Sequence, residues 1–577
     1  MTNHVIAQLF ADVADLLEIR GDNIHRVLSY RKAAENIFAH TQEVALLRAA
    51  GQLTSIPGIG QTLADKIEEM LDTGKLDFYE RLAAEIPVTL LELLQVEGLG
   101  PKRVKQVYET LGIKTLDELE TAAKAGQLRD LPKMGAKSEE KLLKNIQALR
   151  LRGADKRLPL GEVYPIAQQI LAALGGMAGV VQTAVAGSTR RWRDTIGDLD
   201  LLVALDAETG DAAAVMDAFC ALPQAAEVAA HGPTKSRIVL GNGLGVDLRV
   251  LPAANWGTLL AYFTGSQAHN IRLREIAQKQ GLSLNEYAFT NVATGDKILC
   301  ATEEEVYATL GLPFIPPVLR EDRGEIEAAQ AGQLPQLIQQ SDIVADLHMH
   351  TTWSDGKQTV LEMAEAAVAR GLQHICITDH SVSLGIANGL SVERLRQQAA
   401  EIRAANEQMA GRIHIWHGTE MEIKADGSLD YPDEVLAELD FVIASLHVSL
   451  GQPREQMMAR LLKAIENPHV DMIAHPTGRL LPEREGADLD MERVLEAAAR
   501  TQTILEINAN PRRLDLRDIH VRRALELGVK LAINTDAHHV DQFDLLPFGI
   551  ATAQRGWATA ENVVNTWPLE KLREGRP

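Results

Sequence analysis

After residue 341 the sequence alternates regularly between short apolar runs and amphipathic helical segments. Seven of the runs have the composition of strands, from IVADLHMH to KLAINTDAH, and helical patterns such as TVLEMAEAAVARG lie between them. Strands that alternate with helices form parallel sheets, because each helix returns the chain to the same edge of the sheet. Seven such repeats predict a closed parallel barrel whose functional side chains gather at the C-terminal ends of the strands.

Metal-binding residue types stand at nearly all of these strand ends, and 12 of the 17 histidines lie after residue 340. A single histidine at a strand end is more often structural, but nine candidate ligands on successive strand ends favour a metal centre. Imidazole and carboxylate ligands in that number suit about three transition ions such as Mn²⁺, Zn²⁺ or Fe²⁺. The nine candidates are His348, His350, Asp355, His380, Glu420, His447, His475, Asp536 and His538.

Residues 1–150 have a different pattern, with helices of 3.6-residue period separated by glycine-rich turns. A Gly-hydrophobic-Gly turn followed by a polar helix occurs at 58–60 and at 98–100, and a third copy has Lys133 in place of its first glycine. Such turns let backbone N–H groups approach a phosphate, and the following helix adds its positive dipole. One copy alone is as consistent with an ordinary helix–turn–helix connection, but the repetition favours sequence-independent contact with a DNA backbone.

A second set of candidate ligands follows residue 160, where β-branched runs predict strands. In GDLDLLV, Asp198 and Asp200 are two residues apart, so both carboxylates face the same side of one strand. Asp247 in VDLRVLP offers a third carboxylate from another strand. A lone Asp-x-Asp is usually a solvated strand end, but three carboxylates beside the turn AGSTRR suit two Mg²⁺ or Mn²⁺ ions and in-line phosphoryl transfer.

These motifs and the run YFTGSQAHNIRLRE resemble the palm and thumb of the family X DNA polymerases, the group that includes DNA polymerase beta. The resemblance implies that Asp198, Asp200 and Asp247 are the metal-binding catalytic carboxylates, with Asp247 as the base for the primer 3′-hydroxyl. It also implies contacts to the triphosphate, the sugar and the minor groove of the nascent pair. The implied dNTP-binding residues are Gly187, Ser188, Arg191, Gly197, Tyr262, Phe263, Gly265, Asn270 and Arg274.

The runs HRVLSYRKAAENI and PGIGQTLADKI resemble the 5′-phosphate and deoxyribose-phosphate lyase domain of the same family. Lys66 falls where those lyases keep their Schiff-base lysine, and a lysine nucleophile must be desolvated or crowded by cations. Asp65 and Glu69 are near it in sequence, and Thr62 replaces a second family lysine, so a surface lysine that touches phosphate is the alternative. The implied DNA contacts are Gly58, Gly60, Gly98, Gly100, His25, Arg26, Tyr30 and Lys32.

The C-terminal region resembles the PHP family of metal-dependent phosphoesterases, and all nine ligand positions of that pattern are filled. The resemblance implies metal-assisted hydrolysis of a phosphodiester or phosphomonoester. Arg479 and either Arg512 or Arg513 are candidate phosphate contacts, with a solvated charge at the barrel rim as the alternative. Six further histidines fall outside the pattern and receive no role: His374, His414, His417, His469, His520 and His539.

The resemblances divide the chain into six regions and predict a multidomain α and α/β fold. We expect a helical 5′-phosphate or lyase-like domain with a helix-hairpin-helix motif at 1–85, and fingers with helix-hairpin-helix motifs at 86–155. A nucleotidyltransferase palm is expected at 156–255 and a thumb at 256–317. A proline-rich linker at 318–340 then leads to a distorted (β/α)7 PHP barrel at 341–577.

The charge distribution argues against a protein that binds DNA through bulk positive charge. The chain has 58 Lys and Arg against 79 Asp and Glu, for a net charge of −21. Residues 301–577 hold 26 basic and 43 acidic side chains, whereas residues 1–300 hold 32 and 36, so the excess lies mainly in the predicted barrel. This negative charge suits metal binding in the barrel, and local patches of positive charge elsewhere still permit DNA binding.

Three separated cysteines, no signal peptide and no apolar run of about 20 residues predict a cytoplasmic protein without a membrane segment. We expect a monomer that uses dNTPs to fill short gaps during repair of gapped or nicked duplex DNA with a 5′-phosphate. Its PHP domain is expected to be a 3′–5′ exonuclease, with 3′-phosphatase or abasic-site endonuclease activity as further candidates. The alternatives are a PHP domain that acts on small phosphate esters, and a gap-binding scaffold with vestigial sites.

Overall fold

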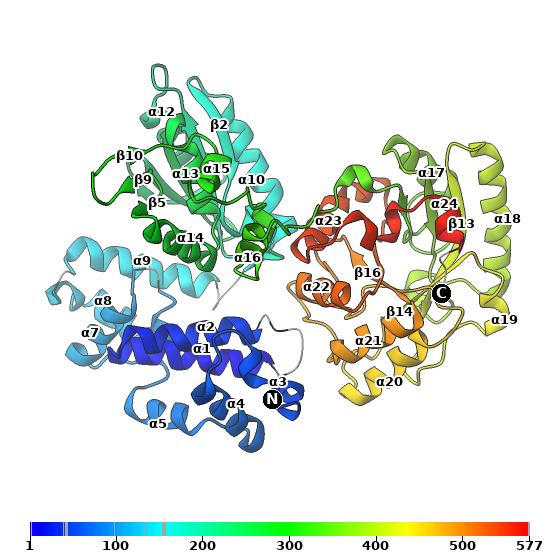
Figure 1. Cartoon of the computed structure of the whole chain (residues 1–577), viewed down its shortest axis with the longest axis horizontal. Helices are drawn as coiled ribbons and strands as arrows, with labels where there is room; N and C mark the ends of the chain where they lie inside the picture. The colour runs from blue at the N-terminus through cyan, green and yellow to red at the C-terminus, as the bar shows by residue number, and fades with distance from the viewer. Residues whose placement is uncertain are drawn as a thin grey trace. The chain divides into compact units, whose positions relative to one another are not determined.

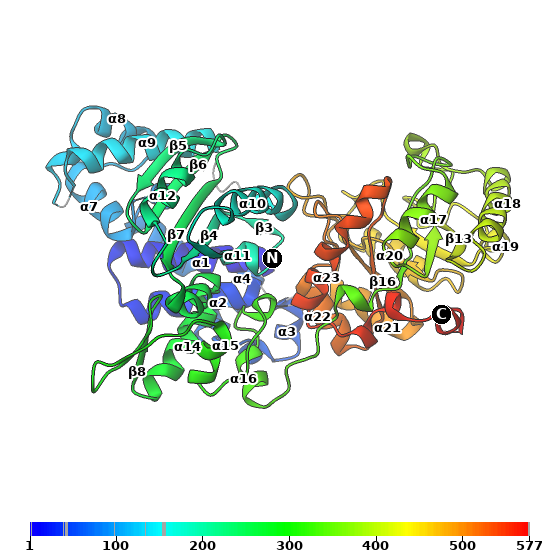
Figure 2. The same cartoon turned by 90° about the horizontal axis from the view of Figure 1, so that it is seen from above.

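The structure is a computed structural model that describes residues 1, 3–38, 40, 44–96, 98–132, 134–152 and 157–574. The chain divides into two compact units, residues 1–156 and 157–577 (Figures 1 and 2), and each is described by itself. Within the described ranges, no helix is both long enough and apolar enough to cross a membrane.

The first unit is helical, as the sequence predicts, and its first two helices lie side by side (Figure 1). Gly58 and Gly98, with φ of 79° and 93°, adopt the left-handed conformation that glycine allows at a hairpin turn. The third predicted turn includes Lys133, which lies outside the described residues. The helices are α1 (Asn3–Arg20), α2 (Ile24–Phe38), α3 (Val44–Ala49), α4 (Gln61–Thr73), α5 (Asp77–Glu85), α6 (Leu90–Leu93), α7 (Pro101–Leu111), α8 (Leu116–Lys124) and α9 (Ala136–Arg152).

The second unit begins with a five-stranded mixed sheet of order β2-β4-β7-β6-β5. Figure 2 labels its strands β4, β5, β6 and β7. The sequence indicates four of these strands but not β5, because its run AAEVAAH is mostly alanine, with Val228 as its one β-branched residue. The strands are β2 (Val180–Val185), β4 (Asp198–Leu205), β5 (Ala225–His231), β6 (Lys235–Leu240) and β7 (Gly245–Pro252). A two-stranded pair, β1 (Leu158–Pro159) and β3 (Thr195–Ile196), and the helices α10 (Leu160–Gly175), α11 (Gly187–Arg190) and α12 (Ala212–Cys220) accompany the sheet.

The region after this sheet combines helices with a small antiparallel sheet. The segment 318–340, expected as a linker, contains a helix, and its apolar side chains Leu319, Ile326 and Leu337 pack into the core of the preceding region. At its end, the backbone of Ile338 exchanges hydrogen bonds with Ala558 and Gln554 of the barrel. The elements are α13 (Trp256–Thr264), α14 (Gln267–Lys279), β8 (Leu282–Leu284), β9 (Phe289–Asn291), β10 (Lys297–Ile298), α15 (Glu303–Thr309) and α16 (Glu325–Gln330).

The remainder is the predicted parallel barrel, and all seven expected strands are present in chain order from β11 to β17. A bridge between Met349 and Ala537 links the two ends of the sheet, so the barrel is nearly closed. Strands such as β12, β14 and β17 are buried over their whole length, as parallel strands covered by helices are. The strands are β11 (Ala345–Asp346), β12 (His374–Ile377), β13 (His414–Glu422), β14 (Phe441–Ser445), β15 (Met472–Ile473), β16 (Ile504–Asn508) and β17 (Leu531–Asn534).

Helices surround these strands, as Figure 1 shows for α17 and α18. Each connects successive strands or closes the ends of the barrel, and their apolar faces supply much of its core. They are α17 (Val360–Ala369), α18 (Val392–Met409), α19 (Asp433–Leu436), α20 (Arg454–Ile465), α21 (Met491–Thr501), α22 (Asp518–Glu526), α23 (Leu546–Arg555) and α24 (Leu569–Glu574).

Candidate functional site

The three predicted palm carboxylates lie together on β4 and β7. These strands run parallel, and Asp200 stands opposite Asp247 in their register, while Asp198 is two residues before Asp200 on β4. Burial, followed by the carboxylates of Asp247 and Asp198, raises the pKa of Asp200 to about 6. A group of like charges that raises a pKa in this way fits divalent cations, which would stabilise the charge that develops during phosphoryl transfer.

An arginine from the neighbouring strand also contacts this group. Arg237 on β6 pairs with Asp247 across the sheet, and its guanidinium donates to Asp247 and, at 3.0 Å, to Asp198 Oδ1. It reaches both carboxylates over Gly245, where an added Cβ would collide with the guanidinium. Arg237 is thus an internal counter-charge for two of the three candidate metal ligands.

The predicted triphosphate turn connects β2 to this group of carboxylates. Gly187 has a φ of 58°, and a Cβ there would collide with the carboxylate of Asp200, so only glycine fits. Ser188 is half-buried beside it in α11, and Gly197 is exposed immediately before Asp198. Arg191 follows α11, and its Nε donates to Glu321 at 3.1 Å while its Nη1 donates to the backbone oxygen of Thr264.

The predicted sugar-contacting residues and minor-groove residues lie close to one another on α13 and α14. The rings of Tyr262 and Phe263 are 5.4 Å apart, and Asn270 Nδ2 donates to the backbone oxygen of Tyr262 at 2.7 Å. Arg274 lines the same small cavity as Tyr262 and Asn270. Gly265 ends α13 with a φ of 69°, which places the end of this run beside Arg191.

The predicted lysine nucleophile lies on α4 beside an aromatic side chain in the first unit. Lys66 Nζ is 4.7 Å from the ring centre of Phe78, and the Arg26 guanidinium is 4.8 Å from the same ring. Burial lowers the pKa of Lys66, and Arg81 and Arg26 lower it further, against the opposing effect of Glu69 and Asp65. The environment therefore favours the neutral amine more than the adjacent carboxylates in the sequence indicate.

The other predicted DNA contacts near this lysine have varied exposure. Tyr30 is buried and stacks on Phe78 at 6.0 Å, whereas His25 and Lys32 are exposed. The Lys32 side chain passes close to Gly58 in the first hairpin turn. A lysine and a glycine turn on one surface are suited to bind a phosphate. The turns Gly58–Gly60 and Gly98–Gly100 stand immediately before α4 and α7.

In the barrel, the nine predicted ligands converge around Glu420. Its carboxylate lies 2.9 Å from His475 Nε2, 3.0 Å from His380 Nδ1 and 3.3 Å from His447 Nε2. His348 Nε2 and Glu420 Oε2 face each other at 3.4 Å, and neither atom makes a hydrogen bond within the described residues. Buried ligand atoms that meet without hydrogen bonding fit a bound cation.

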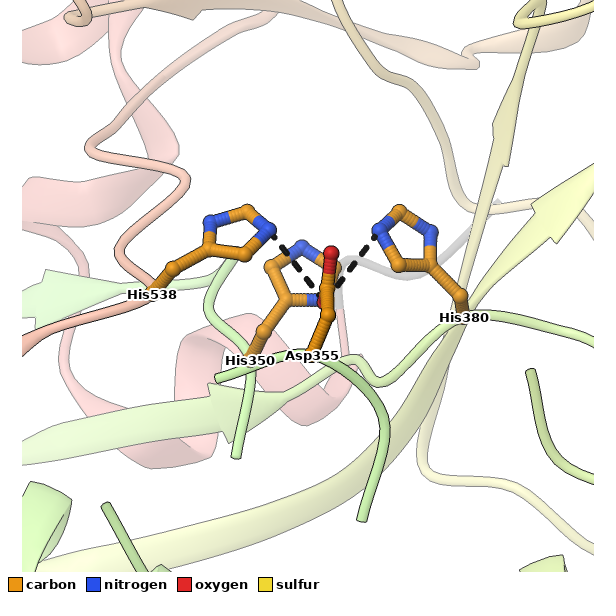
Figure 3. Close-up of side chains that lie close together, drawn as sticks. All are labelled: His350, Asp355, His380 and His538. Carbon is orange, nitrogen blue, oxygen red and sulfur yellow. Dashed lines mark ion pairs between the residues drawn. The ribbon is translucent and has the colours of Figure 1, made fainter. Parts of the chain in front are cut away.

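Three overlapping groups in this cluster have donor atoms close enough to share a metal ion. Figure 3 shows one of them: His380 Nε2 and His538 Nε2 lie 3.7 Å and 3.4 Å from Asp355 Oδ1, with His350 behind. Burial would raise the pKa of Asp355, but the surrounding histidines lower it to about 2. The groups are His350, Asp355, His380 and His538; His348, His350, Glu420 and Asp536; and His380, Glu420 and His447.

The candidate phosphate-binding arginines differ in what they contact. Arg513 lies 3.6 Å from Asp536 Oδ2, within reach of the cluster. Arg512 forms an exposed ion pair with Glu483. Arg479 is buried and donates to the backbone oxygens of Arg513 and Leu514, and its Nη1 donates to Asp194 beside the palm at 3.0 Å.

Comparisons with known proteins show the family to which the chain belongs. Family models match a helix-hairpin-helix domain at residues 1–76, a SAM-like helix-hairpin-helix tandem at 90–148, a DNA polymerase beta thumb at 259–321 and a PHP domain at 346–510. The DNA polymerase/3′-5′ exonuclease PolX of Bacillus subtilis (strain 168) is 41% identical over 570 residues, 98% of each chain. The chain belongs to the family X DNA polymerases that carry a C-terminal PHP domain. The resemblance stated from the sequence is confirmed.

This family X polymerase is also similar, over part of its length, to proteins named as probable phosphatases. A probable phosphatase of Caldanaerobacter subterraneus subsp. tengcongensis is 35% identical over 216 residues, 35% of this chain and 80% of that protein. A probable phosphatase of Thermoanaerobacter sp. (strain X514) is 33% identical over 246 residues, 40% of this chain and 94% of that protein.

Sequence reasoning missed the residues of this family X polymerase that support the ligands. Glu506 Oε1 lies 2.8 Å from His348 Nδ1, and Glu422 Oε2 lies 2.8 Å from His447 Nδ1, so each carboxylate orients a ligand ring. Glu506 is on β16, the strand to which the sequence assigned no ligand. A carboxylate within the fully buried run ILEIN was a signal for such a role. The signal for the role of Arg237 was weaker: it is a basic residue on the strand that pairs with the strand of Asp247.

Proposed function

We propose that this polymerase fills short gaps in DNA from dNTPs and that its barrel removes nucleotides from 3′ ends. The observation that carries the proposal is the presence of both sets of ligands in one chain. The B. subtilis relative, which matches over 98% of the chain, is named as both a DNA polymerase and a 3′-5′ exonuclease. Hydrolysis in the barrel would leave a 3′-hydroxyl, which is the primer end that the palm extends. The two activities would therefore act in succession during repair.

In the palm, we assign Asp198, Asp200 and Asp247 to two Mg²⁺ or Mn²⁺ ions, with Asp247 also accepting the proton of the primer 3′-hydroxyl. Ser188 and the backbone of the triphosphate turn would donate hydrogen bonds to the nucleotide. Among the described residues, Arg191 donates hydrogen bonds through Nε and Nη1 and none through Nη2, so Nη2 can serve the triphosphate. Tyr262 and the rest of α13 would contact the sugar.

In the first unit, we assign the two glycine turns and the surface around Arg26 and Lys32 to the DNA backbone and the 5′-phosphate of a gap. Backbone N–H groups at helix N-termini bind phosphates without reading bases, which suits an enzyme that acts at any sequence. Lys66 is the candidate for an imine with an abasic sugar, because its lowered pKa favours the nucleophilic amine.

In the barrel, we assign the nine ligands to about three Mn²⁺, Zn²⁺ or Fe²⁺ ions, because mixed imidazole and carboxylate donors favour transition ions. Bound ions would polarise a phosphoester and activate water. Three cysteines far apart in the sequence suit a reducing compartment, so we expect a cytoplasmic enzyme, and we expect it to act as a monomer.

The test is the fate of a gapped duplex with a 5′-phosphate, incubated with the full-length protein and dNTPs under Mg²⁺ and then under Mn²⁺. We expect extension to the downstream strand under either ion, and shortening of the 3′ end when dNTPs are omitted and Mn²⁺ is present. Failure of extension under both ions would revive the scaffold alternative.

A second candidate for the barrel is hydrolysis of small phosphate esters, which its similarity to the two probable phosphatases favours. Rates on a 3′-recessed duplex, a 3′-phosphorylated duplex, an abasic-site duplex and a small aryl phosphate separate the candidates. Greater kcat/KM on the aryl phosphate than on every DNA would assign the barrel to small esters.

Lyase activity needs its own test, because an imine is a covalent bond that nucleotide addition does not require. Borohydride should trap the protein on a duplex with an incised abasic site, and Lys66→Ala should abolish the adduct. Thr62→Ala is a matched control on the same helix that leaves the amine in place. Equal trapping of the wild type and Lys66→Ala would reject Lys66 as the nucleophile.

A further inference from the structure

A barrel helix contacts the palm turn that the proposed function assigns to the triphosphate. Arg555, at the end of α23, is only 6% exposed. Its Nη1 donates to the backbone oxygen of Arg191 at 2.6 Å and to Glu321 Oε1 at 2.9 Å, and its Nη2 donates to Asp518 Oδ2 at 2.7 Å. One buried guanidinium from the barrel is therefore bound directly to the backbone of the turn.

Glu321 extends this contact to the Arg191 side chain. The same oxygen, Oε1, that accepts from Arg555 also accepts from Arg191 Nε at 3.1 Å. Burial alone would raise the pKa of Glu321, but Arg555 and Arg191 lower it to about 2, so the carboxylate stays charged at neutral pH. A buried charge that is paired on both sides has a fixed geometry, because each partner restricts its position.

An aromatic contact anchors the next residue of the turn to the same barrel helix. The Trp192 ring lies 5.5 Å from Phe548 of α23 and 4.9 Å from Tyr164 of α10. Trp192 has a φ of 54°, an uncommon value for a non-glycine residue that packing on both sides maintains. The side chains of Phe548 and Arg555 thus hold two successive residues of the turn.

The other end of the turn lies against the catalytic carboxylates. Gly187 contacts Asp200 so closely that no side chain would fit between them. Arg191 Nη1 donates to the backbone oxygen of Thr264, at the end of the proposed sugar-contacting run. Because Nε and Nη1 are held by Glu321 and Thr264, the position of Nη2 is fixed by groups outside the nucleotide.

We propose that Arg555, a residue of the phosphoesterase barrel, is a positioning residue for the polymerase reaction: together with Glu321 it holds the turn 187–192 in the shape that binds the triphosphate. This inference rests on the proposed function of that turn. It implies that the barrel supports nucleotide binding without contacting the nucleotide. A merely structural role for Arg555 would instead lower stability and affect both activities through the fraction of folded protein.

The experiment measures dNTP incorporation on a gapped duplex and hydrolysis at the barrel with the full-length wild type, Arg555→Ala, Arg555→Lys and Arg523→Ala. Arg523 is the matched control, because it forms a barrel ion pair with Glu492 on α21 and takes no part in the contacts with the turn. We expect Arg555→Ala to raise KM for dNTP about tenfold or more with a smaller change in kcat, since charge-assisted hydrogen bonds that fix the turn are lost.

Arg555→Lys should recover part of the affinity, because it keeps the charge but not the forked geometry. Arg523→Ala should leave KM for dNTP within about twofold of the wild type, and barrel hydrolysis by Arg555→Ala should be similarly unchanged. Each variant is assayed well below its measured Tm, where nearly all of the protein is folded.

Wild-type KM for dNTP in Arg555→Ala, or an equal rise in Arg523→Ala, would overturn the inference. Should Arg555→Ala fail to fold, Glu321→Gln decides, because it keeps the size of the side chain and removes the charge that joins Arg555 to Arg191. An unchanged KM in folded Glu321→Gln would also overturn it. Absence of incorporation by the wild type would instead contradict the proposed function, so the two failures are distinguishable.

Discussion

The palm and the barrel build their candidate metal sites in different ways. The palm places three aspartates on two adjacent parallel strands, and the Asp198 side chain is 51% exposed. The barrel collects nine ligands from the ends of six strands, and most of them, with Glu420 at their centre, are buried. The palm site is open and uses only oxygen, whereas the barrel site is enclosed and combines nitrogen with oxygen.

The difference shows what each site depends on. Two strands in register suffice to form the palm site, and an open site can receive a nucleotide and a primer end together. The barrel site exists only when the whole sheet curves and brings β11 next to β17. Two of its histidine rings are held in orientation by further carboxylates, Glu422 and Glu506.

The largest expected effect is the separation of the two activities by single ligand substitutions. Asp200→Ala should lower nucleotide addition by at least about a thousandfold, because a metal ligand that supplies several kcal/mol is lost, and should leave 3′-end hydrolysis intact. His350→Ala, which removes a ligand shared by two groups, should do the reverse. Primer extension and 3′-end degradation measured on each variant provide the check. Loss of both activities in either variant would show that the sites are not independent.

A smaller effect is expected from a carboxylate that supports a ligand without being one. Glu506→Gln should weaken metal binding in the barrel by about 10- to 100-fold, since it replaces the carboxylate that orients His348 with a neutral amide. Nucleotide addition should be unchanged. Competition with a chelator, followed by metal analysis, measures the affinity.

The matched control is Glu492→Gln, which removes a carboxylate paired with Arg523 rather than with a ligand. An equal loss of metal affinity in both variants would mean that barrel stability, not ring orientation, sets the affinity. The barrel site would then resemble the palm site, because the palm ligands also depend on the stability of their sheet.

The smallest expected effect concerns Glu321, where the two regions meet. Its pKa in the folded protein is about 2, below the 4.5 of an exposed glutamate, so its ionisation stabilises the folded state fully above pH 4.5 and progressively less as the pH falls toward 2. The stability difference between the wild type and Glu321→Gln should therefore narrow by about 1 kcal/mol from pH 5.5 to pH 3.5. Urea unfolding at several pH values measures it.

Glu208→Gln, at an exposed palm residue outside these contacts, is the control for the substitution itself. A difference for Glu321→Gln that stays constant between pH 5.5 and pH 3.5 would mean that Glu321 is not ionised between Arg555 and Arg191.

The sequence was most informative where a local pattern determines the structure. The spacing of Asp198 and Asp200 fixes their common face, and buried apolar runs with ligands at their ends identify the barrel strands. The alanine-rich β5 was missed because the pairing with β6, rather than its own propensity, makes it a strand.

Contacts between residues far apart in the chain were not accessible in this way. The side chain of Arg191 was expected at the triphosphate, and the structure adds a buried pair with Glu321, 130 residues away. Arg479 was expected at the barrel mouth, whereas its guanidinium contacts Asp194, 285 residues away. Such pairs depend on tertiary packing, and a single sequence carries no signal for them.

The packed segment 318–340 has a consequence for the ancestry of the protein. Leu319 and Ile326 complete the apolar core on the polymerase side, and Ile338 belongs to that of the barrel. Neither half could be exchanged at this segment by a simple recombination, since each exchange would leave unmatched apolar surface on both sides. Once joined in this way, a polymerase and a phosphoesterase are inherited together, and selection for the fold of either half also maintains the packing of the other.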